Sequence, residues 1–226
     1  FADGTSGSAE FEGEIQYRHS DNTLSLGVGG NRRMVIDTNS RISLANNDSG
    51  SGNTIFGYLA GESIDSGSNN NTFIGVKSGY AGTKNDATNN TAVGHFSLHD
   101  LTSGDNNVAI GKSAGENLTS GGSSVMIGNE AGHGVSTSFN HVLIGDHAGH
   151  KTLADHGTTA VGYYALANAT SGGYNTAIGY QSLEDNVAGE FNVGLGYQTL
   201  KEANSNQNTA IGYQSGMDVT SGVANT

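Results

Sequence analysis

The nine-residue stretch NTAIGYQSL, at residues 175–183, returns almost unchanged as NTAIGYQSG at residues 208–216. A catalytic motif has no reason to occur twice in one chain, whereas a structural unit that buries its apolar face only against a copy of itself must recur. The glycine of this phrase is found ten times, most often at a spacing of 17 residues, which predicts a solenoid of stacked coils. These glycines are Gly57, Gly75, Gly94, Gly111, Gly128, Gly145, Gly162, Gly179, Gly196 and Gly212.

Each unit is numbered here from its first residue, which is Asn in most units. Position 2 is Thr or Val, position 4 is a large apolar residue and position 3 is never polar, so positions 2–6 predict a short strand. A strand without a polar side is buried on both faces. We expect position 4 to fill the coil and position 3 to face a partner. The predicted core ladder is Ile110, Ile127, Ile144, Val161, Ile178, Leu195 and Ile211.

Other positions of the unit predict turns and ladders. A Ser-Gly pair near position 15 is typical of a tight turn, because Gly accepts a positive φ and Ser bonds the local backbone. Stacked coils place equivalent residues above one another at about 4.8 Å. We therefore expect a ladder of Asn amides at position 1 and a ladder of Tyr rings at position 6.

The composition limits the class of protein. Only 34% of the 226 residues are hydrophobic and there is no Trp, so no thick globular core is expected. The absence of Pro fits internal strands, and the absence of Cys excludes a disulfide framework. A net charge of −12 with nine Lys and Arg argues against binding to nucleic acid. No apolar run is long enough to insert into a membrane.

The first fifty residues follow a different pattern. The segments EIQYRH, TLSLGV, RRMVID and RISLA alternate apolar and polar residues between turn-forming clusters. We expect an antiparallel β-meander over residues 1–50, acting as a shaft or capping segment. Residues 51–226 are expected to form the β-solenoid domain, with ten coils and the start of another.

The pattern NTAIG-x-x-[ST]-L with a Ser-Gly turn resembles repeats of phage tail fibres. It is also similar to the shorter head repeats of trimeric bacterial adhesins, and the resemblance covers residues 53–226. Those heads wind as left-handed parallel β-rolls with three chains side by side. The resemblance therefore implies a left-handed β-roll and a homotrimer.

The Tyr-Gln pairs are the candidate binding surface, because aromatic and amide ladders suit sugar rings. The alternative interpretation, that the rings stack coil on coil and hold the register, is favoured. Recognition could equally lie in the irregular loops at residues 82–89 and 136–140. The candidate surface residues are Tyr163, Tyr180, Gln181, Tyr197, Gln198, Tyr213 and Gln214.

Catalysis and metal binding are weaker alternatives. His133 and His150 both occupy position 10 in adjacent units, with His141, His147 and His156 nearby, and could hold a transition metal. A polar outward turn that happens to use His is the favoured interpretation. No carboxylate pair departs from the repeat in a way that suggests glycoside cleavage. We expect no enzyme activity, no cofactor and no resident metal.

The resemblance to tail-fibre repeats implies a structural segment of a virion tail fibre, exposed outside the cell. It would support or contribute to host-receptor recognition through a rigid trimer and multivalent binding. The expected partners are a host cell-surface glycan or protein and other tail or baseplate proteins. The alternatives are a bacterial trimeric surface adhesin head or stalk, a glycan-depolymerising tailspike, and a monomeric solenoid such as an ice-binding one. The last is disfavoured because position 3 varies from Gly to Phe.

Overall fold

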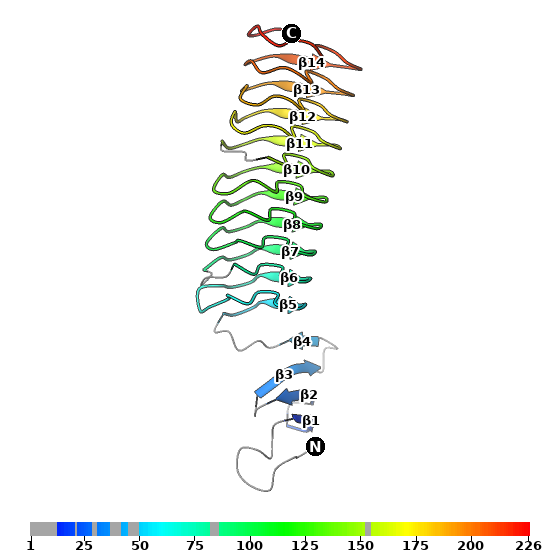
Figure 1. The fold of residues 1–226 in the computed structure, drawn as a ribbon. Coiled ribbons are helices and arrows are strands. Elements are labelled where there is room, and N and C mark those ends of the chain that lie inside the picture. Colours follow the sequence, from blue (N-terminus) through cyan, green and yellow to red (C-terminus); the bar gives the residue numbers. More distant parts are fainter. Residues whose placement is uncertain are drawn as a thin grey trace. The chain divides into compact units, whose positions relative to one another are not determined.

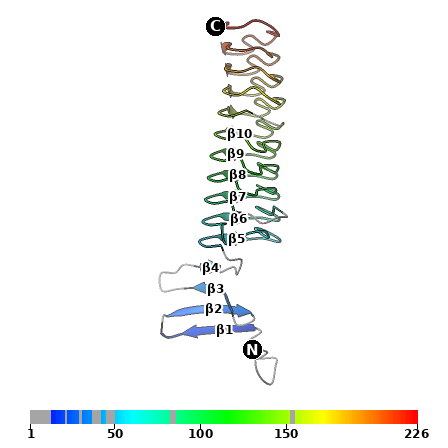
Figure 2. The same cartoon turned by 90° about the vertical axis from the view of Figure 1, so that its left-hand side faces the viewer.

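The computed structural model describes residues 13–20, 22–28, 31–36, 42–44, 50–81, 86–151 and 155–226. The chain divides into two compact units, Phe1–Ser49 and Gly50–Thr226. All regular elements in the described ranges are strands (Figures 1 and 2). The prediction of an all-β chain, with a parallel solenoid after an antiparallel meander, is confirmed.

The first unit contains a four-stranded antiparallel sheet in the order β1-β2-β3-β4. Its strands are β1 (Gly13–Arg18), β2 (Thr23–Val28), β3 (Asn31–Ile36) and β4 (Ile42–Leu44). Ile15 lies opposite Leu26 and Tyr17 lies opposite Leu24, so these four side chains share one face. All four are exposed within the single chain, which leaves this sheet with an uncovered apolar face.

The second unit is a ten-stranded parallel sheet in which each strand pairs with its successor in the sequence. One strand of three residues comes from each coil, and the coils stack directly on one another (Figure 1). Equivalent residues are paired, as Ala160 is with Ala177. The strands are β5 (Thr54–Phe56), β6 (Thr72–Ile74), β7 (Thr91–Val93), β8 (Val108–Ile110), β9 (Val125–Ile127), β10 (Val142–Ile144), β11 (Thr159–Val161), β12 (Thr176–Ile178), β13 (Val193–Leu195) and β14 (Thr209–Ile211).

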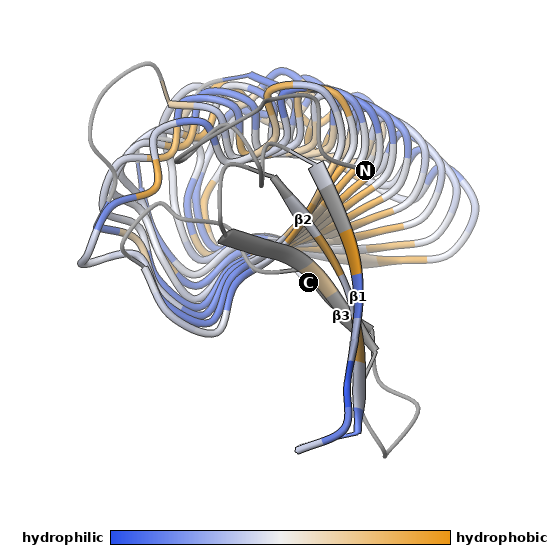
Figure 3. Cartoon of the chain, turned by 90° about the horizontal axis from the view of Figure 1, so that it is seen from below, coloured by the Kyte–Doolittle hydropathy of each residue, from blue (hydrophilic) through white to orange (hydrophobic). Residues whose placement is uncertain are grey.

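Position 3, not position 4, lines the interior of the coils. Ala109, Met126 and Leu143 are fully buried, whereas Ile110 is 39% exposed and Ile211 is 65% exposed. The strand residues of successive coils form continuous hydrophobic rows (Figure 3). The assignment of position 4 to the core is therefore wrong, and position 4 lies on the outer face. The residues concerned are Ile110, Ile127, Ile144, Val161, Ile178, Leu195 and Ile211.

The side chains at positions 3 and 9 fill the narrow interior together, and a large side chain at one position accompanies a small one at the other. Leu143 at position 3 is matched by Gly149 at position 9, whereas Ala160 at position 3 is matched by Leu166. Leu166 is fully buried, so the leucine supplies the bulk that the alanine lacks. Small residues are thus required inside wherever position 9 is large, and the branched residues of position 4 are left outside.

The recurrent glycine at position 5 is required by the close stacking of the coils. At Gly128 φ is 138°, a conformation that residues with a side chain rarely adopt. A Cβ at this position would also collide with the carbonyl oxygen of Gly145 on the next coil. The repeated glycine is therefore explained by backbone approach, without any binding role.

The predicted Asn ladder at position 1 is confirmed and carries two kinds of hydrogen bond. Asn192 donates its backbone N–H to the Oδ1 of Asn175 at 2.8 Å, and the backbone N–H of Asn208 donates in turn to the Oδ1 of Asn192 at 2.9 Å. The Nδ2 of Asn192 donates to the carbonyl of Ser205 in the turn at 2.7 Å. Each amide thus joins two coils and closes a turn inside a buried corner.

Candidate recognition surface

Four tyrosine rings at position 6 form a continuous stack over the last four coils. The ring centroids are 5.2 Å apart between Tyr163 and Tyr180, and 5.1 Å apart between Tyr180 and Tyr197 and between Tyr197 and Tyr213. The planes of neighbouring rings differ by 14°, 5° and 10°. The repeat of the backbone therefore fixes a parallel aromatic ladder.

The glutamines at position 7 form a second ladder beside the rings. The Nε2 of Gln198 donates to the Oε1 of Gln181 at 2.7 Å, and the Nε2 of Gln214 donates to the Oε1 of Gln198 at 3.0 Å. Each glutamine has a φ close to 50°, and its backbone N–H donates to the carbonyl of the tyrosine one coil earlier. The left-handed backbone conformation of the glutamine turns the chain directly after the tyrosine in each of these coils.

The stacking decides which part of each ring can meet a ligand. Tyr180 and Tyr197 have a ring against both faces and remain 42% and 41% exposed, so they present edges and hydroxyl groups to solvent. Partial desolvation, then the neighbouring Tyr164 and two carboxylates, raises the pKa of Tyr163. This hydroxyl remains protonated near neutral pH. The surface offers rows of hydroxyls and amides, and Tyr213 is the most exposed ring of the four, at 74%.

Tyr58 does not belong to this ladder, although it occupies position 6 of the first coil. The five coils between Tyr58 and Tyr163 carry other residues at that position, so no ring contact joins them. The candidate loop at residues 136–140 lies in the described part of the chain, whereas residues 82–85 of the other loop lie outside it.

A second exposed aromatic pair lies immediately before position 1. The rings of Tyr174 and Phe191 stack at 5.2 Å with planes 2° apart, and the side chains are 56% and 49% exposed. This pair was not predicted from the sequence. The available signal was an aromatic residue directly before the Asn of two consecutive units.

The candidate metal ligands His133 and His150 do lie together. Their rings stack with centroids 5.2 Å apart and planes 28° apart. His150 also lies beside His147, which was noted from the sequence only as a nearby histidine, and beside Glu130, which was not predicted. The signal for them was a His-x-x-His spacing with a glutamate one period before the first histidine.

No protein-family model matches the chain, and neither a curated protein nor a solved structure is significantly similar to it. Within the described ranges, no helix is long and apolar enough to cross a membrane.

Proposed function

We propose that the chain is a structural, non-enzymatic segment of a phage or phage-like tail fibre, built as a homotrimer. The observation that carries this proposal is the apolar outer face of the solenoid. Position 2 is always Thr or Val and position 4 is always Ile, Val, Leu or Phe, over ten coils. Uncovered apolar faces of this extent mark sites of association.

The partner in this proposal is another copy of the chain. The burial of Ala109, Ala160 and Ala177 needs no second copy, because these side chains fill the coil itself. Association instead covers the outer residues, such as Ile178 at 37% and Leu195 at 41% exposure. The exposed apolar face of β1 and β2 in the first unit has the same requirement. The threefold number rests on the resemblance to adhesin heads.

Host recognition in this proposal uses the Tyr and Gln ladders. The hydroxyl groups repeat over the last four coils and the amide groups over the last three, which suits a glycan with repeated hydroxyl groups. Three copies on one rigid rod would bind a multivalent cell surface more strongly than one copy. The proposed location is a virion fibre outside the cell, and a bacterial surface adhesin is the alternative with the same architecture.

The mass in solution tests the assembly. Light scattering or sedimentation should give a mass near three times 23.1 kDa, and a stable monomer contradicts the proposal. Binding of fluorescent protein to host cells then tests recognition. The variants Tyr180→Ala and Tyr197→Ala should weaken that binding, whereas Phe191→Ala serves as a matched exposed aromatic control.

Because position 3 lies inside the coil and position 4 lies outside, a second candidate function is that of a monomeric solenoid that binds ice. The variable position 3 is interior, and the outer face is the regular array of Thr or Val and aliphatic residues at positions 2 and 4. A monomeric mass together with thermal hysteresis of freezing would favour this candidate. Hysteresis absent from a monomer would remove it.

A further inference from the structure

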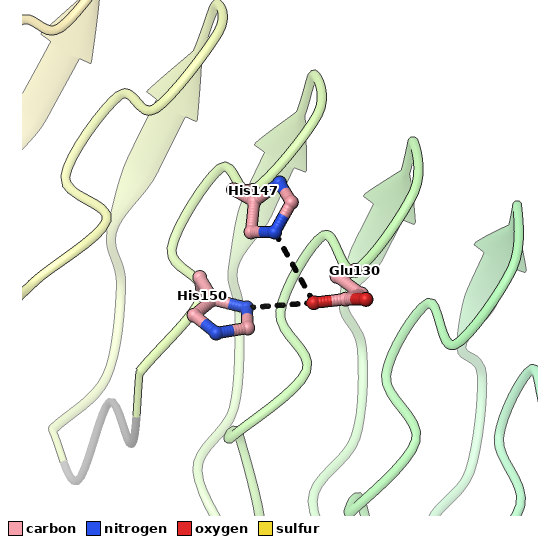
Figure 4. Close-up of side chains that lie close together, drawn as sticks. All are labelled: Glu130, His147 and His150. Carbon is pink, nitrogen blue, oxygen red and sulfur yellow. Dashed lines mark ion pairs between the residues drawn. The ribbon is translucent and has the colours of Figure 1, made fainter.

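A carboxylate and two imidazoles converge between two adjacent coils (Figure 4). Glu130 belongs to the coil of β9, and His147 and His150 belong to the coil of β10. The Oε2 of Glu130 lies 3.2 Å from the Nε2 of His147 and 3.6 Å from the Nδ1 of His150. One ligand atom from each residue lies within 4.8 Å of the other two.

We propose that Glu130, His147 and His150 form a binding site for Zn²⁺ or a similar divalent transition-metal ion. Two imidazole nitrogens and one carboxylate oxygen are a donor set that Zn²⁺ accepts, with a fourth position left for water. Bonds of about 2.0–2.2 Å in a tetrahedral arrangement place the donor atoms roughly 3.3–3.5 Å apart. The two distances to Glu130, 3.2 and 3.6 Å, lie on either side of this value.

A second layer of contacts orients His147 for this role. Its Nδ1 lies 2.7 Å from the Oδ1 of Asp146, which in turn accepts a hydrogen bond from the Nδ2 of Asn129 at 2.9 Å. With the proton of His147 on Nδ1, the lone pair of Nε2 points toward Glu130. Ligating histidines typically make such a contact to a carboxylate.

His150 supplies an independent observation. Its Nδ1 is buried and has no hydrogen-bond partner among the described residues. A buried polar atom without a partner is unfavourable, and coordination to an ion would satisfy it. A neutral imidazole at this position has the lone pair that a metal ligand needs.

The carboxylate of Glu130 is also oriented for coordination. The Nζ of Lys112 lies 3.3 Å from its Oε1, which leaves Oε2 directed at the two imidazoles. The contact with the Lys112 ammonium favours the ionised form of this carboxyl group.

The place of this cluster in the fold indicates what a bound ion would do. The cluster joins the coils that begin at Ser124 and His141, where the Asn ladder is interrupted. These side chains and Thr158 have no carboxamide group, and the Oγ1 of Thr158 is buried with no hydrogen-bond partner in the described part of the chain. An ion held by both coils would fasten the stack where the ladder makes fewer hydrogen bonds.

The test is titration of Zn²⁺ into the untagged chain after removal of metals with a chelator. Calorimetry should show one ion per chain, and the ion should raise the midpoint of thermal unfolding. Glu130→Gln and His147→Gln should each weaken binding at least tenfold. Gln is suitable at both sites because it occupies position 7 elsewhere, at Gln181 and Gln198. Asp146→Asn should weaken binding about 10- to 100-fold through the orientation of His147.

His99→Gln is the matched control, since the Nδ1 of His99 also contacts a neighbouring carboxylate, Asp100, at 2.6 Å but lies outside the cluster. It should leave the affinity unchanged. Unfolding of each variant in chelator checks that its fold is intact. The proposal is overturned if Zn²⁺ shows no saturable binding, or if the Glu130→Gln/His147→Gln double variant, folded in chelator, binds Zn²⁺ as the parent does.

Discussion

The side chain of Met126 occupies the space that a side chain at Gly115 would need. A Cβ at Gly115 would lie 2.8 Å from the Cε and 2.9 Å from the Sδ of Met126, and 3.0 Å from a methyl group of Leu98. The coil of Ala109 and Gly115 is small at both interior positions, and residues of the coils before and after it fill the gap. Volume is thus shared along the solenoid as well as within one coil.

Because positions 3 and 9 fill one space, two substitutions that each lower the free energy of unfolding should compensate one another when combined. Leu166→Gly alone should lower the free energy of unfolding by about 2–5 kcal/mol through a cavity. Ala160→Leu alone should lower it by about 1–3 kcal/mol through overpacking. The double variant reproduces the pairing of Leu143 with Gly149 and should recover most of the loss. Urea unfolding in a double-mutant cycle measures this, and simple additivity would contradict it.

The glycine at position 5 gives a prediction with an internal control. Gly128→Ala should lower the free energy of unfolding by about 3–5 kcal/mol, because backbone strain is joined by a collision with Gly145. Gly212→Ala places a Cβ in a site with nothing within 4 Å, although φ is 119° there. It should cost only about 1–3 kcal/mol of strain. Equal losses in thermal or urea unfolding would show that contact between coils is not the cause.

The buried and the partly exposed amide ladders should differ in their contribution to stability. Asn192→Ala leaves the backbone N–H of Asn208 and the carbonyl of Ser205 without their partners in a buried corner. It should lower the free energy of unfolding by about 2–4 kcal/mol. Gln198→Ala removes similar bonds near solvent and should cost less than about 1 kcal/mol. The order of the two unfolding midpoints checks this, and the reverse order would contradict it.

His141 predicts a specific dependence of stability on pH. Burial, and then the nearby His156, lowers the pKa of His141 from 6.5 to about 4. Below about pH 6.5 the imidazole of His141 binds a proton in the unfolded chain but stays neutral in the folded chain. This residue therefore lowers the free energy of unfolding as the pH falls to about 4. The loss approaches about 3 kcal/mol and is constant at lower pH.

The variant His141→Asn isolates this effect and restores the Asn of the repeat. The difference in unfolding free energy between variant and parent should grow between about pH 7 and about pH 4.5. Urea unfolding at several pH values measures it. His99→Asn, the same substitution at a half-buried histidine of another coil, serves as the matched control. A difference between His141→Asn and the parent that does not change with pH would refute the assignment.

The outer face predicts the effect of a charge on assembly. Ile178→Asp places a carboxylate on the apolar row of position 4 and should convert the assembly to monomers by sedimentation, with the coil interior unchanged. Val187→Asp adds the same charge at a turn residue of similar exposure, 40% against 37%, and should leave the mass unchanged. An Ile178→Asp protein with the parent mass would exclude this face from the interface.

The period of the glycines was enough to predict the solenoid, its coil length and the Asn ladder. Polarity could not predict which face of the strand lies inside the coil, because Ala177 and Ile178 are both apolar. The alternation along the strand therefore has no polar face that would identify the outer side. Residue volume held the missing information. A large residue occurs at position 9 only where position 3 is Ala or Gly, as with Leu183 and Ala177, which shows that the two positions share one small space.

The Tyr stack could also be predicted, because identical residues one period apart must lie above one another. The cluster of Glu130, His147 and His150 could not be found in the same way, since it joins position 7 of two coils with position 10 of one. Its members meet only because residue 7 of each coil has a positive φ, 54° at Glu130 and 56° at His147. The sequence does not signal this turn, because position 7 carries residues such as Glu, His, Gln or Leu and not the Gly that usually marks a positive φ.

Backbone and side-chain hydrogen bonds join successive coils along the stack, from Asn53 to Asn225. Tension applied along the stack is therefore shared at each level by many bonds that must break together, and one ruptured level leaves the others intact. The strength of such a rod is that of its weakest level. Pulling single molecules from both ends should show the first rupture at the levels of Ser124, His141 and Thr158, where the side-chain amides are replaced.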